Sequence, residues 1–561
     1  MKLRRLFAAP AVAGLIAVSA CGGGGGQDSG NQDEPAIAPI SSQDTNIQDR
    51  ASLQQGGQVR LAVADFGSNW NPLHVDGNNA DLTEARNPIL PTLFNYDPKG
   101  VPSPNTDWLL SATETSKSPT TVNFKLNPKA VWGDGSPVDG DDMAAMWKAC
   151  NAENKAFNCA STQGYDSIKS ITTGADKFDV TVTFKGPYPD WTAPFSSVVR
   201  AESVKDADTF NKGWVDLKNE WLSGPFKVQS FDKTQKVLTE VPNDKWWGDK
   251  PLLDKVTFRT ISPDATAAAF VNNELDSFDI GPDPDAFQRA QGVADTQIRK
   301  AAGPNFRHFT FNTKAGLLTD KAIRQAIVRG LDRTAIGASD LAGIDWPVRP
   351  LNNHILLENQ EGYADSAKAT GLDYDPEKAK ADLDAAGWKP GADGIREKDG
   401  KKLEVKFSQL SGVPVSENEA LQAQNQLKEI GIKVNIVNVP VAKFQDGSLL
   451  SGHEFEIVAF SWIGTPYPFT NIDQIYGTGK DSNYAQLSMP EVDALVKQIN
   501  TETDIPKRIQ LTNDADKIIW ENVHTLPLYQ RPELVAVKAK LANYGAKGLS
   551  NFQWEDIGYQ K

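Results

Sequence analysis

Few residue patterns in this 561-residue sequence could carry out catalytic chemistry. It contains no Gly-x-Ser-x-Gly motif, the nucleophile turn of many hydrolases. Residues 477–481 resemble part of a phosphate-binding loop, but the earlier glycine and the Ser or Thr after Lys480 are missing. No two of the five histidines have metal-ligand spacing: His74, His308, His354, His453 and His524. We therefore expect a protein that is not an enzyme and that has no cofactor.

A secreted glycosidase is the least favoured alternative. The 14 tryptophans could stack on sugars, and Asp283 and Asp285 form a carboxylate pair. A linear sequence does not show whether two acids flank one sugar, and most tryptophans in a chain of this length belong in a core. Turnover of a chromogenic glycoside would be needed to support this alternative.

Two of the three cysteines are placed to form a structural disulfide. Cys150 and Cys159 close a ten-residue loop, and a disulfide there would stabilise the fold by about 2–3 kcal/mol. Redox-active pairs are usually spaced Cys-x-x-Cys. The spacing therefore favours a structural disulfide, which is typical of an exported protein.

The third cysteine, Cys21, lies in a bacterial lipoprotein signal. Three basic residues precede a mostly apolar stretch, residues 6–18, that is too short to span a bilayer. The stretch ends in Val18-Ser19-Ala20-Cys21, which resembles a lipobox, whose cysteine becomes lipidated after cleavage. An ordinary signal peptide with a chance cysteine is the alternative. We predict a signal peptide at 1–20, a lipidated flexible tether at 21–50, and a location on the extracytoplasmic face of the cell membrane.

Composition and periodicity indicate a large, acidic body of mixed α/β structure. The net charge of −14 argues against a nucleic-acid partner. Alternating apolar residues predict strands at 58–63, 121–126, 178–184, 256–261 and 433–439. Helical spacing predicts helices at 320–331, 376–386 and 417–430, the last two each followed by a glycine. The length suggests three or four domain-sized units.

Eight short motifs follow one another along the chain. They are Asn71-Pro72; residues 131–138 followed by Asp141-Asp142; residues 223–226; Asn312; residues 320–333; residues 374–380; residues 426–432; and residues 526–529. Most of them have a structural use, such as Gly133 and Gly135 in a tight turn and Asp141-Asp142 at a helix start. Their order resembles the extracytoplasmic solute-binding proteins of the peptide and nickel ABC-importer family.

The resemblance implies a two-lobed α/β fold, periplasmic-binding-protein-like (type II, cluster C). Lobe I would comprise 51–305 and 526–561, with an inserted subdomain at about 89–200, and lobe II would comprise 306–525. Two crossings would join the lobes, near residues 305–310 and 525–529. The expected role is a monomer that captures a small peptide or related solute by closure and delivers it to an ABC permease with ATPase subunits.

In peptide-binding relatives the ligand's main chain pairs with a segment of each lobe. On this chain those segments are Asp76, Gly77 and Asn78 in lobe I and Ser461, Trp462, Ile463 and Thr465 in lobe II. Trp462 lies between a predicted strand at 455–460 and a proline-containing loop, so we expect its indole to face the cleft between the lobes, with a buried core tryptophan as the alternative.

At one position the sequence departs from the family pattern. Relatives commonly have an aspartate three residues after the tryptophan to hold the ligand's ammonium group, and this chain has Thr465. Asp76 or Asp473 is the candidate replacement, and Arg349 is a candidate partner for a ligand carboxylate. The alternatives to a peptide importer are a ligand-sensing lipoprotein and a receptor for haem or a chelated metal.

Overall fold

The computed structural model describes residues 40–561, so the predicted signal peptide and Cys21 lie outside the described residues. Its first sheet has the order β2-β11-β10-β9 (Gln58–Val63, Lys255–Thr260, Val237–Pro242, Phe226–Asp232). Alternate residues of β2 are buried, as its sequence pattern predicts. Almost 200 residues separate β2 from β11, yet the two strands pair in parallel.

A second sheet has the order β5-β6-β8-β7 (Leu109–Lys117, Thr120–Leu126, Asp179–Phe184, Ile168–Thr173). It lies within the predicted insertion, next to helix α2 (Gly140–Cys150). The sequence predicted Asp141-Asp142 as the cap of this helix. Its N-cap is instead Asp139, which forms a capping box with Asp142, so both predicted residues lie in the first turn. Both sheets contribute side chains to one hydrophobic core.

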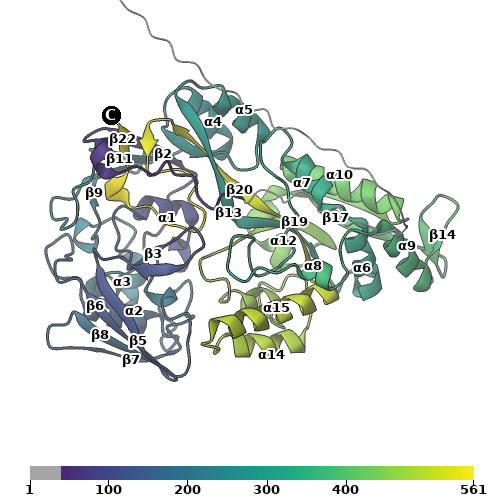
Figure 1. Cartoon of the computed structure of the whole chain (residues 1–561), viewed down its shortest axis with the longest axis horizontal. Coiled ribbons are helices and arrows are strands. Elements are labelled where there is room, and N and C mark those ends of the chain that lie inside the picture. Colours follow the sequence, from purple (N-terminus) through teal and green to yellow (C-terminus); the bar gives the residue numbers. More distant parts are fainter. Residues whose placement is uncertain (1–39) are drawn as a thin grey trace, which may run out of the picture. The chain divides into compact units, whose positions relative to one another are not determined.

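The largest sheet has the order β12-β20-β13-β19-β17-β18 (Ser277–Asp279, Thr525–Lys538, Thr296–Phe311, Ile457–Ile463, Glu404–Ser411, Lys433–Pro440). The long strands β13 and β20 pair antiparallel, and Figure 1 shows them side by side between the N-terminal elements and the helices α6, α7 and α10. Their pairing breaks between Ala302 and Phe306 and shifts again at His308. The two predicted crossings are thus neighbouring segments of one strand pair.

The main helices of the second half are α6 (Lys321–Gly330), α7 (Arg333–Asp340), α9 (Pro376–Ala385), α10 (Pro414–Glu429), α14 (Pro490–Ile499) and α15 (Ile505–Asn522). The three predicted helices are confirmed as α6, α9 and α10. Asp320 is the N-cap of α6 and accepts a hydrogen bond from the Ala322 N–H. Helix α10 begins three residues before its predicted start, with Pro414 as its first residue.

The remaining elements are short. They are α1 (Ala80–Arg86), α3 (Ala207–Lys212), α4 (Pro263–Val271), α5 (Pro284–Gln291), α8 (Ser366–Ala369), α11 (Val441–Gln445), α12 (Ser448–Ser451), α13 (Ile472–Tyr476), β1 (Leu53–Gln54), β3 (Phe94–Tyr96), β4 (Pro102–Pro104), β14 (Lys389–Pro390), β15 (Arg396–Lys398), β16 (Lys401–Lys402), β21 (Leu541–Ala542) and β22 (Gly558–Gln560). None of the helices in residues 40–561 is both long enough and apolar enough to cross a bilayer.

Two large hydrophobic cores divide the described chain. The first joins residues 59–258 with residues 537–557. The second runs from Ile261 to Ala536 and includes α4 and α5. Residues 261–290, which the sequence assigned to lobe I, therefore pack in the second core. The division into lobes at residue 305 stays a prediction.

The structure does not agree with the prediction that residues up to 50 form a flexible tether. Asp44 pairs with Ala546 through two main-chain hydrogen bonds of 2.8 and 3.0 Å, and Arg50 forms an ion pair of 2.7 Å with Asp556. Residues 44–50 are thus fastened to the C-terminal part of the chain, and they are not a free tether. The rest of the predicted tether, residues 21–39, lies outside the described residues.

Candidate binding site

Strand β19 has one open edge. On one side it pairs with β13 along its whole length, from Ile457 with Phe311 to Ile463 with Asn305. On the other side, within residues 40–561, β17 pairs only with Ile457 and Val458. Residues 459–463 therefore have no strand neighbour on that side within the described chain. Unpaired strand edges can accept another extended segment.

Main-chain groups at this edge point in known directions. The Gly464 N–H donates to the Pro304 carbonyl and the Asn312 N–H donates to the Glu456 carbonyl, both at 2.8 Å. Antiparallel pairing alternates, so even-numbered residues of β19 bond to β13. Ser461 and Ile463 consequently direct their N–H and C=O groups away from β13, toward the open edge.

The Trp462 side chain is stacked with two other rings. Its indole is parallel to His308 and to Tyr484, with interplanar angles of 8° and 4° and centroid separations of 5.9 Å in both cases. Burial lowers the pKa of His308 well below its usual value, so the ring is neutral. Trp462 is half-buried, which is intermediate between the predicted cleft position and a core position.

Several buried polar atoms beside this edge have no protein partner. Within the described chain, Trp462 Nε1, Ser461 Oγ, Asn305 Oδ1 and His308 Nε2 make no hydrogen bond. Most buried polar groups in proteins are hydrogen-bonded. Ser461 and Trp462 are consecutive residues of β19 and so point to opposite faces of the sheet, and Asn305 and His308 belong to the neighbouring strand β13. The unpartnered atoms of β19 and β13 are therefore available on both faces of the sheet to bond a polar ligand or water.

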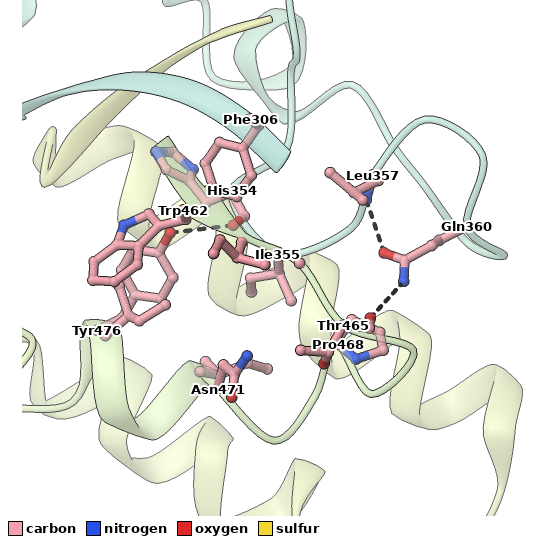
Figure 2. A pocket seen from close by; sticks show the side chains of 14 residues that line it. Phe306, His354, Ile355, Leu357, Gln360, Trp462, Thr465, Pro468, Asn471 and Tyr476 are labelled. Atoms are coloured by element: carbon pink, nitrogen blue, oxygen red, sulfur yellow. Dashed lines mark hydrogen bonds between the residues drawn. The ribbon is translucent and has the colours of Figure 1, made fainter. Parts of the chain in front are cut away.

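A cavity of about 40 Å³ adjoins the end of β19 (Figure 2). Fourteen residues line it, from the middle of β13 (Phe306), the 354–360 loop, residues 462–471 and α13. Gln360 braces two of these segments: its Oε1 accepts from the Leu357 N–H at 3.0 Å, and its Nε2 donates to the Thr465 carbonyl at 3.4 Å. The Tyr476 hydroxyl donates to the His354 carbonyl at 3.1 Å.

The predicted lobe I segment has a different conformation from β19. Residues Val75–Gly77 form a 3-10 turn, in which the Asp76 N–H donates to His74 Nδ1 at 3.1 Å. The Gly77 and Asn78 N–H groups also have partners inside the turn. Gly77 packs so closely on Asn71 that a Cβ atom would lie 1.9 Å from the Asn71 carbonyl oxygen. The Asp76 side chain is 59% exposed, so its carboxylate is accessible.

The other predicted charged anchors are engaged within the protein. Asp473 forms an ion pair with Lys480 at 2.5 Å and is not among the cavity-lining residues. Arg349 lies 3.6 Å from Glu358, whose pKa is raised by burial. Asp283, which the sequence analysis considered for a glycosidase carboxylate pair, is the N-cap of α5. These contacts do not place Asp473 or Arg349 in the cavity, and their roles stay predictions.

Cys150 and Cys159 form a disulfide in the structure, with Cα atoms 5.8 Å apart. Within residues 40–561, no three His, Cys, Asp or Glu side chains are grouped so as to hold a metal ion.

Sequence reasoning missed Phe306, His354, Gln360 and Tyr484. No local motif identifies them, because three separate segments bring them to Trp462.

An open strand edge beside a cavity is an arrangement that can accept an extended solute. A sequence profile of the family described as bacterial extracellular solute-binding proteins, family 5 Middle, matches residues 104–483. The oligopeptide-binding protein OppA of Mycobacterium tuberculosis (strain ATCC 25618 / H37Rv) is 35% identical over 522 residues, covering 92% of this chain and 87% of that protein. The chain belongs to this family, the solute-binding proteins of peptide and nickel ABC importers.

Solved structures agree with this assignment. The periplasmic EDTA-binding protein EppA has a TM-score of 0.83 and 27% identity, covering 93% of this chain and 99% of that one. The oligopeptide-binding protein AppA from Bacillus subtilis, in complex with a nonapeptide, has a TM-score of 0.70 and 21% identity, covering 91% of this chain and 100% of that one. The predicted fold class, periplasmic-binding-protein-like of type II, cluster C, is confirmed. The family is one of extracytoplasmic substrate-binding proteins.

Proposed function

We propose that this protein is the lipid-anchored receptor of an ABC importer, capturing small peptides or related solutes and delivering them to permease and ATPase subunits. Its family membership supports the importer role. The names of two similar proteins, both oligopeptide-binding, support a peptide as the ligand. Native mass spectrometry of solute that co-purifies with the protein would identify its chemical class.

The observation that carries this proposal is the open edge of β19. The N–H and C=O groups of Ser461 and Ile463 are directed away from β13, and β17 stops pairing with β19 at Val458. A peptide laid along this edge would pair through its main chain, whatever its side chains are. Such pairing suits a receptor that accepts many sequences.

Ser461→Pro tests the edge directly. Proline removes the outward N–H of residue 461 and leaves the bonds of Phe460 and Trp462 to β13 intact, since proline is tolerated at strand edges whose N–H faces away. We expect this variant to bind an alanine pentapeptide at least tenfold more weakly than wild type, measured by calorimetry.

Ser461→Ala is the matched control. It removes the unpartnered Oγ and keeps the main-chain N–H, so we expect a smaller loss of affinity than with proline. Wild-type affinity of a folded Ser461→Pro protein would contradict main-chain pairing at this edge. Melting temperatures of both variants show whether they are folded.

The Asp76 turn is our candidate for the lobe I side of the site. The accessible carboxylate of Asp76 favours it over Asp473 as the partner of a ligand ammonium group, because Asp473 is already paired with Lys480. Asp76→Asn should weaken peptides with a free amino terminus and spare acetylated ones. If Asp76→Asn weakens the binding of free and acetylated peptides equally, Asp76 does not hold the ligand's amino group.

Closure about the β13–β20 pair is the proposed capture step. Pairing between these strands breaks between Ala302 and Phe306, next to the residues that carry the open edge. A local break in a strand pair lets the two sides move with few bonds lost. Small-angle scattering with and without peptide should show a more compact protein when peptide is bound.

The anchor at Cys21 rests on the lipobox pattern of the sequence. Cys21→Ser should release the protein from the membrane and leave ligand binding unchanged. Membrane retention of this variant would contradict lipidation at Cys21.

A receptor for a chelated metal is the second candidate function. The structural similarity to an EDTA-binding protein favours it. Within the described residues no protein side chains are grouped to hold the metal, so a small chelator would supply the ligands. Calorimetry with iron–EDTA, compared with the pentapeptide, separates the two candidates.

A further inference from the structure

We propose that the cavity beside Trp462 is a side-chain pocket that admits one uncharged aliphatic group, about the size of a valine or leucine side chain, and excludes charged groups. This inference rests on the proposed function, since it assigns a selectivity to a peptide lying along β19. The ligand class is therefore a peptide with a small apolar residue at one position, flanked by main chain that pairs with Ser461 and Ile463.

The cavity wall carries no free charge. Phe306, Leu357, Ile463 and Ile475 contribute apolar surface. The polar groups on the wall include Gln360 and Asn471, which are neutral amides. Among its fourteen lining residues there is no Asp, Glu, Lys or Arg.

The two ionisable residues of the wall are both hydrogen-bonded inside the protein. His354 is fully buried, with Nδ1 2.7 Å from Asp516 Oδ1 and Nε2 3.1 Å from the Thr525 carbonyl oxygen. Both ring nitrogens thus lie within hydrogen-bonding distance of protein oxygen atoms. The Tyr476 hydroxyl donates to the His354 carbonyl. Neither side chain is left to neutralise a charged ligand group.

Charged residues next to the wall are already paired. Asp473 follows the lining residue Ile472 and is paired with Lys480 at 2.5 Å. Glu358 follows Leu357 and lies 3.6 Å from Arg349. An ammonium or carboxylate entering the cavity would lose its water and meet no opposite charge, which is strongly unfavourable.

The size of the cavity limits the group that fits. One water needs about 10–15 Å³ of space, and the cavity of about 40 Å³ is larger than that. It therefore has room for a small branched group such as isopropyl or isobutyl. A benzene ring occupies an engineered cavity of about 150 Å³, so phenylalanine and tryptophan should fit poorly unless the wall moves.

The cavity is also in the right place for a ligand on β19. Ile463, Gly464 and Thr465 belong to its wall, and Ile463 directs its main-chain groups to the open edge. A peptide residue paired beside Ile463 would place its own side chain next to the cavity. The same strand end therefore supplies both the main-chain partner and the side-chain pocket.

The first experiment uses alanine pentapeptides in which one residue is replaced in turn by Leu, Phe, Lys or Asp at each of the five positions. We expect calorimetry to show one position at which Leu binds at least tenfold more tightly than Lys or Asp, with Phe in between. Equal affinities for Leu, Lys and Asp at every position would overturn the pocket while leaving peptide binding in place. Failure of every peptide to bind would contradict the proposed function as well.

The second experiment introduces a charge into the wall. Thr465 Oγ1 accepts a hydrogen bond from the Tyr467 N–H at 3.2 Å, and Asp or Asn can accept at the same place in such a turn. With amino-acetylated peptides, which lack the terminal ammonium that an aspartate at 465 could also hold, Thr465→Asp should therefore bind the Lys peptide at least tenfold more tightly than wild type, with a matching loss for the Asp peptide. Thr465→Asn keeps the shape without the charge and should leave both affinities near wild type. If Thr465→Asp and Thr465→Asn bind the Lys peptide equally, charge exclusion is wrong.

Discussion

The guanidinium group of Arg508 on α15 donates to both carboxylate oxygens of Asp190, with N···O distances of 2.8 and 2.5 Å. The two side chains are 2% and 12% exposed. Arg508 also lies over the Phe469 ring at 4.2 Å. Nearby in the fold, the hydroxyl groups of Tyr96 and Tyr467 are 2.7 Å apart. These contacts connect β3 and the loop around Asp190 to α15 and to the loop after β19, which lines the candidate cavity.

The first prediction is that Asp190→Ala destabilises the protein. Removing the carboxylate leaves the buried Arg508 guanidinium without its partner, which costs about 3–5 kcal/mol in comparable buried pairs. Urea unfolding followed by circular dichroism measures the change. We expect the midpoint to fall and the denaturant dependence to stay the same.

The double variant Asp190→Ala, Arg508→Met is the control. Methionine removes the unpaired charge, so we expect recovery of part of the lost stability. An additive loss in the double variant, or no loss in Asp190→Ala, would show that the ion pair does not hold these segments together.

The second prediction concerns Trp462. Trp462→Ala should weaken peptide binding by about 1–3 kcal/mol, roughly ten- to a hundredfold, through lost stacking and burial. It should also remove most of the ligand-induced change in tryptophan fluorescence. Because the Trp462 ring is stacked with His308 and with Tyr484, we expect a lower melting temperature too.

Trp462→Phe separates the two contributions. It keeps a ring in the stack and removes the unpartnered Nε1 donor. We expect a nearly normal melting temperature with weaker binding. Normal peptide affinity in Trp462→Ala, together with a much lower melting temperature, would mean that the residue is only structural.

The elements that the sequence predicted are those with strong local signals. The alternation of apolar and polar residues is enough to predict β2. Asp320 marks the start of α6, and Gly431 marks the end of α10. Residue patterns predicted the strand before Trp462 but ended it too early. β19 continues to Ile463 because β13 provides partners as far as Asn305, which lies 158 residues earlier in the sequence.

The candidate site was less predictable for the same reason. Trp462 and Thr465 belong to one predicted segment that lines the cavity. Phe306, His354 and Gln360 also line it but come from other parts of the chain. Nothing in their local sequence distinguishes them from core residues. The pairing of Asp473 with Lys480 depends on how α13 meets the following loop, which residue spacing alone does not fix.

The third prediction concerns the disulfide. The Cys150–Cys159 loop is hydrogen-bonded to the segment before Asp76: the Val75 N–H donates to the Asn158 carbonyl at 2.9 Å, and the Ala160 N–H donates to the Leu73 carbonyl at 2.8 Å. Non-reducing peptide mapping should give one crosslinked fragment, and reduction should lower the melting temperature by a few degrees.

The same loop supports the Asp76 turn, so reduction should also raise amide hydrogen exchange at Val75. Hydrogen exchange in β18 is the internal control, because this strand is at the far edge of the six-stranded sheet and does not include the disulfide loop. Two free thiols in the exported protein, or unchanged exchange at Val75 after reduction, would contradict this coupling.

The last prediction follows from Asp340, which joins the crossing strand β20 to α10. Tyr529 and Asn418 donate to its two carboxylate oxygens at 3.1 and 2.6 Å. The neighbouring Glu419 is held by Arg307 of β13, with Nε and Oε1 2.9 Å apart. Burial, reinforced by the charge of Glu419, raises the pKa of Asp340 to about 7.

Between about pH 4, where an exposed aspartate titrates, and pH 7, the folded protein keeps a proton on Asp340 that the unfolded chain has lost. This group therefore makes the protein less stable as pH rises through that window, by up to about 1.4 kcal/mol per pH unit, and has no further effect above it. Asp340→Asn removes the titration, so its free energy of unfolding relative to wild type should increase between pH 4 and pH 7. Glu377→Gln on the exposed face of α9 makes the same change in charge and should show no such trend. Parallel pH profiles for Asp340→Asn and wild type, measured by urea unfolding, would show that Asp340 is ionised in the folded protein throughout this range.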